Sequence, residues 1–140
     1  MGEPINPPKT FTVEEAEALL PRLRPLLERI QHIQQDLLRI SQPMEEVTRK
    51  LAAGNGYPIQ SLTEELERLT KQQSQIEEQF QDAPDAIEQL GASLKDPNRG
   101  LIDFYGVRDG ELIFLCWKLG EDRVRFWHAL EDGYAGRQPL

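Results

Sequence analysis

The sequence predicts an α+β protein that is mostly α: a long antiparallel helical hairpin, coiled-coil-like, followed by a small C-terminal β-hairpin module with a short terminal helix or loop. Two observations predict this fold. Residues 23–90 carry two long apolar seams with alternating three- and four-residue spacing. Residues 101–119 carry two apolar, β-rich runs on either side of a turn dipeptide. The chain then divides into a flexible lead-in (1–10), the helical hairpin (11–91) and the β module with its tail (92–140).

The first helix should begin after Thr12, because Thr12 and Glu15 form a capping-box pattern. Pro21 and Pro25 follow soon afterwards. A proline inside a helix removes a hydrogen bond and clashes with the preceding turn. We therefore expect a short helix over Thr12–Leu20 and a break or kink near Pro21.

The two seams predict helices that pair along their lengths. The first seam consists of Leu23, Leu26, Ile30, Ile33, Leu37, Ile40, Met44, Val47 and Leu51. The second consists of Leu62, Leu66, Leu69, Gln73, Ile76, Phe80, Ala83, Ile87 and Leu90. Strict alternation over this length favours a coiled coil over an ordinary amphipathic helix. Residues 54–58 form the turn, Ser61 or Thr63 should cap the second helix, and Gln73 is a polar residue that can fix the register.

Several apolar residues lie off these seams: Leu19, Leu20, Leu27, Leu38 and Ile59. A two-helix hairpin buries only one stripe of each helix. The remaining apolar side chains therefore predict a further partner, which is the C-terminal segment, a second copy of the chain, or both.

The β-hairpin has two registers that the residues support equally. A two-residue turn at Asp109-Gly110 would place Asp103 opposite Cys116. A three-residue turn with a bulge would place Ile102 opposite Cys116 instead. The first register puts an acid beside the thiol, and the second gives a more uniformly apolar face.

Three further segments complete the module. Residues 92–95 are expected to form a short third strand. Residues 121–130 have apolar residues at helical spacing and form a short helix or a structured loop. Residues 133–140 form a glycine-bearing tail.

Four stretches of the C-terminal third resemble an uncharacterised bacterial family, number 2203 of the domains of unknown function. They are Gly100-Leu101-Ile102-Asp103-Phe104, Leu115-Cys116-Trp117-Lys118-Leu119-Gly120-Glu121, Trp127-His128 and Gly136-Arg137-Gln138-Pro139. The resemblance extends over nearly the whole chain, with the helices similar in character. It implies a shared fold and brings no known activity with it.

A mixed set of metal ligands is concentrated in this segment: Asp103, Cys116, Glu121 and His128. Thiolate, imidazole and carboxylate together suit a transition metal ion. If residues 121–131 were helical, Glu121, His128 and Glu131 would share one face. The alternatives are a Cys116 that packs in the core or reacts as a thiol, and a His128 that bonds to Glu121 or Glu131.

Trp117 and Trp127 are expected to anchor the sheet on the helices, largely buried. Arg137 is expected to reach back to a carboxylate, Glu121 first and Asp103 second, and so to order the tail. A planar guanidinium suits such bidentate pairing.

Composition excludes several function classes. The net charge of −8 and the pI near 4.8 argue against nucleic acid and anionic lipid as partners. A single cysteine fits a reducing compartment. We expect a cytoplasmic protein with neither a signal peptide nor a membrane span.

These observations favour a non-catalytic interaction or scaffold protein. It would form a homodimer through its helical hairpin and recognise an unknown protein partner through its C-terminal module. The alternative is a small transition-metal-binding protein, or a metal-dependent enzyme, with its site in the C-terminal module.

Overall fold

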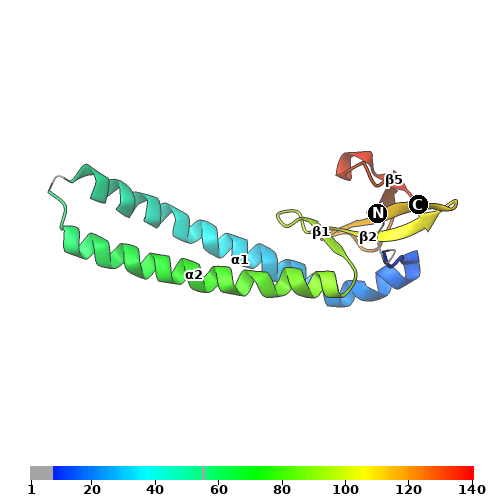
Figure 1. Cartoon of the computed structure of the whole chain (residues 1–140), viewed down its shortest axis with the longest axis horizontal. Coiled ribbons are helices and arrows are strands. Elements are labelled where there is room, and N and C mark those ends of the chain that lie inside the picture. Colours follow the sequence, from blue (N-terminus) through cyan, green and yellow to red (C-terminus); the bar gives the residue numbers. More distant parts are fainter. Residues whose placement is uncertain (1–7, 55) are drawn as a thin grey trace, which may run out of the picture.

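Two long helices pack side by side, and a five-stranded antiparallel sheet covers one end of the pair (Figure 1). This is the predicted mostly helical α+β architecture. The computed structural model describes residues 8–54 and 56–140, so most of the predicted lead-in, residues 1–7, lies outside it. The elements are α1 (Val13–Ala53), α2 (Ile59–Gln89), β1 (Ser93–Asp96), β2 (Leu101–Arg108), β3 (Glu111–Lys118), β4 (Phe126–His128), η1 (Tyr134–Gly136) and β5 (Gln138–Pro139).

Helix α1 begins at the predicted capping box. The Thr12 amide donates to Glu15 Oε1 at 2.9 Å, and the Glu15 amide donates to Thr12 Oγ1 at 3.1 Å. The predicted break near Pro21 is wrong, because α1 continues through Pro21 and Pro25 to Ala53. Apolar residues on both sides of these prolines pack into one core, and this tertiary burial stabilises a continuous helix despite the lost hydrogen bonds.

Helix α2 begins earlier than predicted. Its N-cap is Pro58, without a side-chain cap, so neither Ser61 nor Thr63 caps it. Thr63 instead lies inside the helix and its hydroxyl donates to the Ile59 carbonyl. The fixed φ of proline suits a helix start, and this explains the shift.

The seams meet as predicted. No seam position is exposed in the described residues, and Gln73 is half-buried between its apolar neighbours on the seam. The far end of the hairpin has a small core of its own, formed by Val47, Leu62 and Leu69.

The sheet is a meander in the order β1-β2-β3-β4-β5. The β2–β3 turn has two residues, because Arg108 pairs with Glu111 and Asp103 with Cys116. Asp109 and Gly110 both have positive φ, at 52° and 80°, as a type I′ turn requires. The first of the two predicted registers is therefore correct.

One apolar core joins the helices to the inner face of the sheet. It includes Leu23 and Ile87 from the helices and Phe104 and Trp117 from the sheet. The off-seam residues Leu20 and Leu27 belong to it, and Leu19 packs against it, whereas Leu38 and Ile59 are 70% and 63% exposed. The C-terminal segment is thus the partner for three of the five off-seam residues. Neither helix in the described chain has a stretch apolar enough to cross a bilayer.

The segment after Gly120 is not helical, which corrects one of the two alternatives for residues 121–130. It is a loop followed by β4, and β4 pairs with β3. The tail adds β5, which pairs with β4. Pairing along the free edge of β3 satisfies backbone groups that a helix could not, so it overrides the helical spacing.

Candidate functional site

Three neighbouring strands bring Asp103, Cys116 and His128 together on the outer face of the sheet. Asp103 on β2 lies directly opposite Cys116 on β3, and His128 on β4 lies beside them, opposite Phe114. Side chains alternate along strands. Since Phe104 and Trp117 point into the core with the helices, their neighbours Asp103 and Cys116 face away from it. All three are buried nonetheless, with exposures of 2%, 0% and 3%.

The hydrogen bonds of His128 define where its protons lie. Its Nδ1 is 2.8 Å from the carbonyl oxygen of Ala129, and its Nε2 is 3.0 Å from Asp103 Oδ2. A carbonyl can only accept, so Nδ1 carries a proton. One further proton joins Nε2 and Oδ2, and the buried pair is neutral as a unit. The predicted alternative in which His128 bonds to Glu121 or Glu131 is wrong, because the strand directs its ring to Asp103.

Cys116 is placed beside this pair but is not activated by it. Burial, and then the charge of Asp103, raise the pKa of the Cys116 thiol from 9.0 to about 12, although the nearby Arg137 lowers it. Both ring nitrogens of His128 are already engaged, so neither is free to take the thiol proton. A nucleophilic cysteine needs such a base or a depressed pKa. The arrangement therefore argues against nucleophilic catalysis.

The same arrangement could hold a metal ion. One ligand atom each from Asp103, Cys116 and His128 lies within 4.8 Å of the others. In tetrahedral zinc sites, ligand atoms lie about 3.4–3.6 Å apart, from bond lengths near 2.0–2.3 Å. The 4.8 Å limit exceeds this spacing by about 1.2–1.4 Å, so a contraction of no more than that would suffice. The bond from Nδ1 to a backbone carbonyl is also the usual support of a ligating histidine.

One oxygen of the group has no partner. Asp103 Oδ1 is buried and has no hydrogen-bond partner of ordinary geometry within the described residues, although the Asp103 carboxylate lies close enough to the Cys116 thiol for a weak S–H bond that helps to raise the pKa of the thiol. An unpaired buried carboxylate oxygen costs free energy. It is available for a ligand.

Glu121, the fourth predicted ligand, lies elsewhere. Arg137 binds both of its carboxylate oxygens, through Nη1 at 2.8 Å and Nη2 at 2.7 Å. The Lys118 amide donates to it as well, at 2.7 Å. Burial opposes ionisation, but the Arg137 and Lys118 bonds prevail and lower the pKa of Glu121. The predicted contact between Arg137 and Glu121 is confirmed, and the bond removes Glu121 from the ligand group.

The Arg137–Glu121 pair has aromatic walls that the sequence analysis did not identify. The Arg137 guanidinium lies 4.2 Å from the Phe126 ring centre and 4.8 Å from that of Tyr134. The only sequence signal was the aromatic residue between the glycines of the tail. Arg137 Nη2 also donates to the Cys116 carbonyl at 3.3 Å, which links the pair to the ligand group.

The two tryptophans differ in burial. Trp117 is fully buried in the core, as predicted, whereas Trp127 is half-buried and packs against the edge of that core. Neither indole N–H has an acceptor among the described residues.

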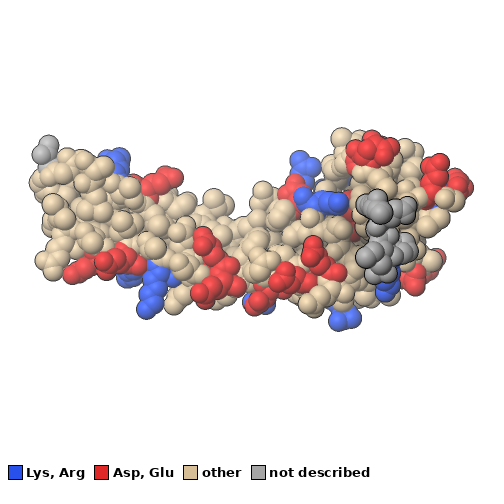
Figure 2. Space-filling view, in the orientation of Figure 1, with Lys and Arg blue, Asp and Glu red and all other residues tan. Residues whose placement is uncertain are grey.

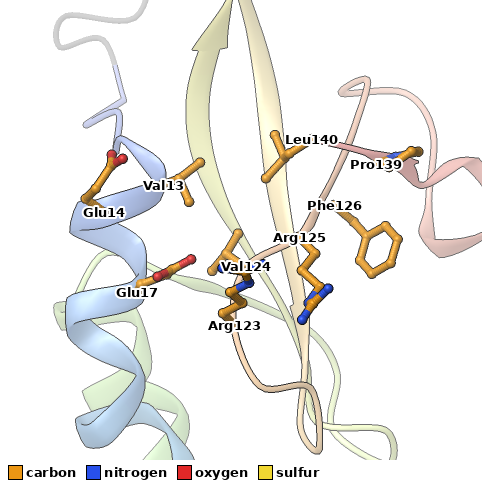
Figure 3. A pocket seen from close by; sticks show the side chains of 9 residues that line it. All are labelled: Val13, Glu14, Glu17, Arg123, Val124, Arg125, Phe126, Pro139 and Leu140. Carbon is orange, nitrogen blue, oxygen red and sulfur yellow. The ribbon is translucent and has the colours of Figure 1, made fainter.

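One groove lies away from the ligand group (Figure 3). It has a volume of about 610 Å³ and runs between the start of α1 and the loop that leads into β4, with Pro139 and Leu140 at its edge. Glu14 and Glu17 form one wall, and Arg123 and Arg125 face them. Arg125 is already paired with Asp122 at 2.8 Å. The groove therefore adds no reactive group to the site.

Comparison with known proteins identifies a family and no closer relative. No curated protein and no solved structure matches the chain. A family model described as "Uncharacterized conserved protein (DUF2203)" matches residues 9–140. That range includes both helices and every strand of the sheet. The chain therefore belongs to the uncharacterised conserved family DUF2203.

Proposed function

We propose that this protein binds a divalent transition-metal ion through Asp103, Cys116 and His128. The observation that supports this most strongly is the convergence of the three side chains from three strands in a buried cluster. Thiolate, imidazole and carboxylate are the zinc-type ligand set. The unpaired Asp103 Oδ1 adds to the argument, because an ion would satisfy a buried oxygen that lacks a partner.

The burial of the cluster favours retention of the ion over turnover of a substrate. A catalytic metal needs an open coordination position that a substrate can reach. Here the three ligand residues are at most 3% exposed. The proposed role is accordingly structural or sensory, and the protein acts without catalysis.

Titration with Zn²⁺ and Co²⁺, together with elemental analysis of untagged protein, tests the proposal. We expect one ion per chain and a thiolate charge-transfer band with Co²⁺. Asp103→Asn, Cys116→Ser and His128→Asn should each lose binding. The matched control is Glu131→Gln, which changes an exposed acid of the same segment and should bind like the wild type. Sub-stoichiometric metal in every preparation, with no saturable titration, would contradict the proposal.

A second candidate function is protein interaction, with self-association through the hairpin and partner recognition by the C-terminal module. Two sets of exposed apolar residues favour it. Leu38 and Ile59 lie on the hairpin, and Val107 and Leu112 form an exposed cross-strand pair at the tip of the β2–β3 hairpin. Figure 2 also shows acidic side chains along the helical hairpin. A protein partner that binds the hairpin would therefore need basic groups.

Light scattering decides whether the chain self-associates. A homodimer has twice the monomer mass of 16.1 kDa at micromolar concentration. Leu38→Gln with Ile59→Gln should then return the mass to that of the monomer, whereas Leu112→Gln should not. A monomer mass for the wild type would exclude self-association and leave only recognition of another protein.

A further inference from the structure

The metal-ligand cluster is buried, and residues 129–137 lie against the strands that carry it: Arg137 Nη2 donates to the Cys116 carbonyl, and the Tyr134 hydroxyl accepts from Lys118. The three side chains are buried, although they lie on the face of the sheet that the helices do not cover. Figure 1 shows the C-terminal segment, in red, on the side of the sheet opposite the start of α1. Movement of this segment would remove Arg137 from its contact with Cys116.

Polar contacts around Arg137 hold the segment in place. The guanidinium binds Glu121 through two hydrogen bonds and reaches the Cys116 carbonyl with a third. It is sandwiched against the rings of Phe126 and Tyr134. The side chains of Arg137 and Glu121 are only 10% and 18% exposed, so the pair is shielded from solvent. Charge-assisted bidentate pairs of this kind are stronger than ordinary hydrogen bonds.

Two further polar contacts attach the segment: Lys118 Nζ donates to the Tyr134 hydroxyl at 3.3 Å, and His128 Nδ1 donates to the Ala129 carbonyl at 2.8 Å. Apolar attachment is sparse. Among the described residues, none from 129 to 137 belongs to either apolar core. Its backbone bonds at Asp132, Gly136 and Arg137 are internal turns. Beyond it, only the two-residue β5 and the Leu140 amide, 2.8 Å from the Arg125 carbonyl, attach the chain to the sheet. Segments with few buried apolar contacts open locally without unfolding the rest of a protein.

We infer that residues 129–137 form a latch, fastened by Arg137 and Glu121, that controls access to Asp103, Cys116 and His128. The meaning of the latch for metal uptake rests on the proposed metal-binding function. Opening of the latch can be measured without metal, because the same movement exposes the thiol of Cys116. That thiol is a specific probe, since the chain has a single cysteine.

The test measures the rate at which Cys116 reacts with an aromatic disulfide reagent in the metal-free full-length protein at pH 8. Arg137→Gln and Glu121→Gln should each react faster than the wild type, by about tenfold to hundredfold, because hydrogen bonds to charged groups contribute about 1.5–3 kcal/mol. Loss of Arg137 also removes a charge that lowers the pKa of the thiol, and this alone would slow the reaction. Acceleration in Arg137→Gln therefore reports opening. Arg137→Lys, which keeps the charge but loses the bidentate geometry, should be intermediate.

The matched control is Arg125→Gln, which breaks the exposed Arg125–Asp122 pair and should leave the rate unchanged. Low concentrations of urea separate local from global opening: labelling through the latch should be nearly independent of urea, whereas labelling through unfolding rises steeply. Unchanged rates in both variants, or a urea dependence equal to that of global unfolding, would overturn the latch.

Zn²⁺ uptake then distinguishes the two proposals. If the metal site and the latch are both correct, Glu121→Gln should take up and release Zn²⁺ faster at unchanged stoichiometry. If thiol labelling accelerates but no variant binds Zn²⁺, the latch stands and the metal site fails. If Zn²⁺ binds but labelling and uptake rates are unaffected by either substitution, the latch fails and the metal site stands.

Discussion

The buried pair of Asp103 and His128 makes a quantitative prediction that separates its structural role from metal binding. His128 Nδ1 donates to the Ala129 carbonyl, and one proton joins Nε2 to Asp103 Oδ2. In Asp103→Asn, the amide N–H can donate to Nε2 of the neutral imidazole in the same place. The hydrogen bond survives, so the loss in free energy of unfolding should be about 1 kcal/mol.

Asp103→Ala removes the partner altogether. It leaves a buried imidazole nitrogen unpaired and opens a cavity at a residue that is 2% exposed. Breaking a buried pair in this way typically costs about 3–5 kcal/mol. That is a large part of the total stability of about 5–15 kcal/mol expected for a domain, and it corresponds to a fall of about 10–15 °C in Tm.

Urea unfolding followed by tryptophan fluorescence and by far-UV circular dichroism gives both values, because Trp117 lies in the core. Coincident transitions would justify a two-state treatment. Two results would refute the reasoning. If Asp103→Asn is as costly as Asp103→Ala, the carboxylate charge matters and the pair is not a shared-proton unit. If Asp103→Ala costs less than about 1 kcal/mol, the pair is effectively solvated. A folded Asp103→Asn that does not bind Zn²⁺ would also assign Asp103 as a ligand.

Three further predictions follow from the same contacts. Binding of Zn²⁺ should release about two protons near neutral pH, one from the Cys116 thiol and one from the Asp103–His128 pair. Calorimetry in buffers of different ionisation enthalpy measures this number. Release of fewer than one proton would contradict ligation by both groups. Because the folded state raises the pKa of the Cys116 thiol from 9 to about 12, the stabilisation linked to this thiol is complete below pH 9 and is lost as the pH rises toward about 12. The free energy of unfolding of the wild type should therefore fall in this range relative to that of Cys116→Ala, by up to about 1.4 kcal/mol per pH unit. Parallel pH profiles of the two proteins would exclude this. Trp117→Ala should cost about 3–5 kcal/mol and Trp127→Ala clearly less, because Trp117 is fully buried and Trp127 only half-buried, and equal shifts in the urea midpoint would contradict the difference.

The helices could be predicted because their information is local and periodic. The seam from Leu23 to Leu51 and its counterpart from Leu62 to Leu90 repeat a spacing that only a paired helix buries on one side. The prolines misled the prediction at residue 21, since sequence alone does not reveal that Leu20, Leu23 and Leu27 all belong to one core shared by the helices and the sheet. Tertiary burial decided what local propensity opposed.

The sheet was only partly predictable. Asp109-Gly110 located the hairpin, but the choice between the two registers depends on whether the outer face can bury an acid, and this depends on what covers it. Part of that cover comes from the tail, because Arg137 contacts Cys116 and Tyr134 contacts Lys118, and residues 129–137 show no periodicity. Strands β4 and β5 have three and two residues, too few for an alternation pattern, so they could not be distinguished from the helical spacing of Val124, Trp127 and Leu130.

Three of the four predicted metal ligands converge, and in the proposed metal site the balance of charge would explain why the fourth is not needed. Without metal, the Asp103–His128 pair shares one proton, the thiol of Cys116 is protonated, and Glu121 is neutralised by Arg137. With a divalent ion, the Asp103 carboxylate and the Cys116 thiolate supply two negative charges to a neutral imidazole site. Both states have no net charge, so a buried cluster pays little electrostatic penalty in passing from one to the other. A monovalent ion would leave an excess negative charge and a trivalent ion an excess positive one. If Glu121 joined the ligands, Arg137 would lose its partner inside the protein. The pairing of Glu121 with Arg137 therefore favours a site that has three protein ligands and selects divalent ions.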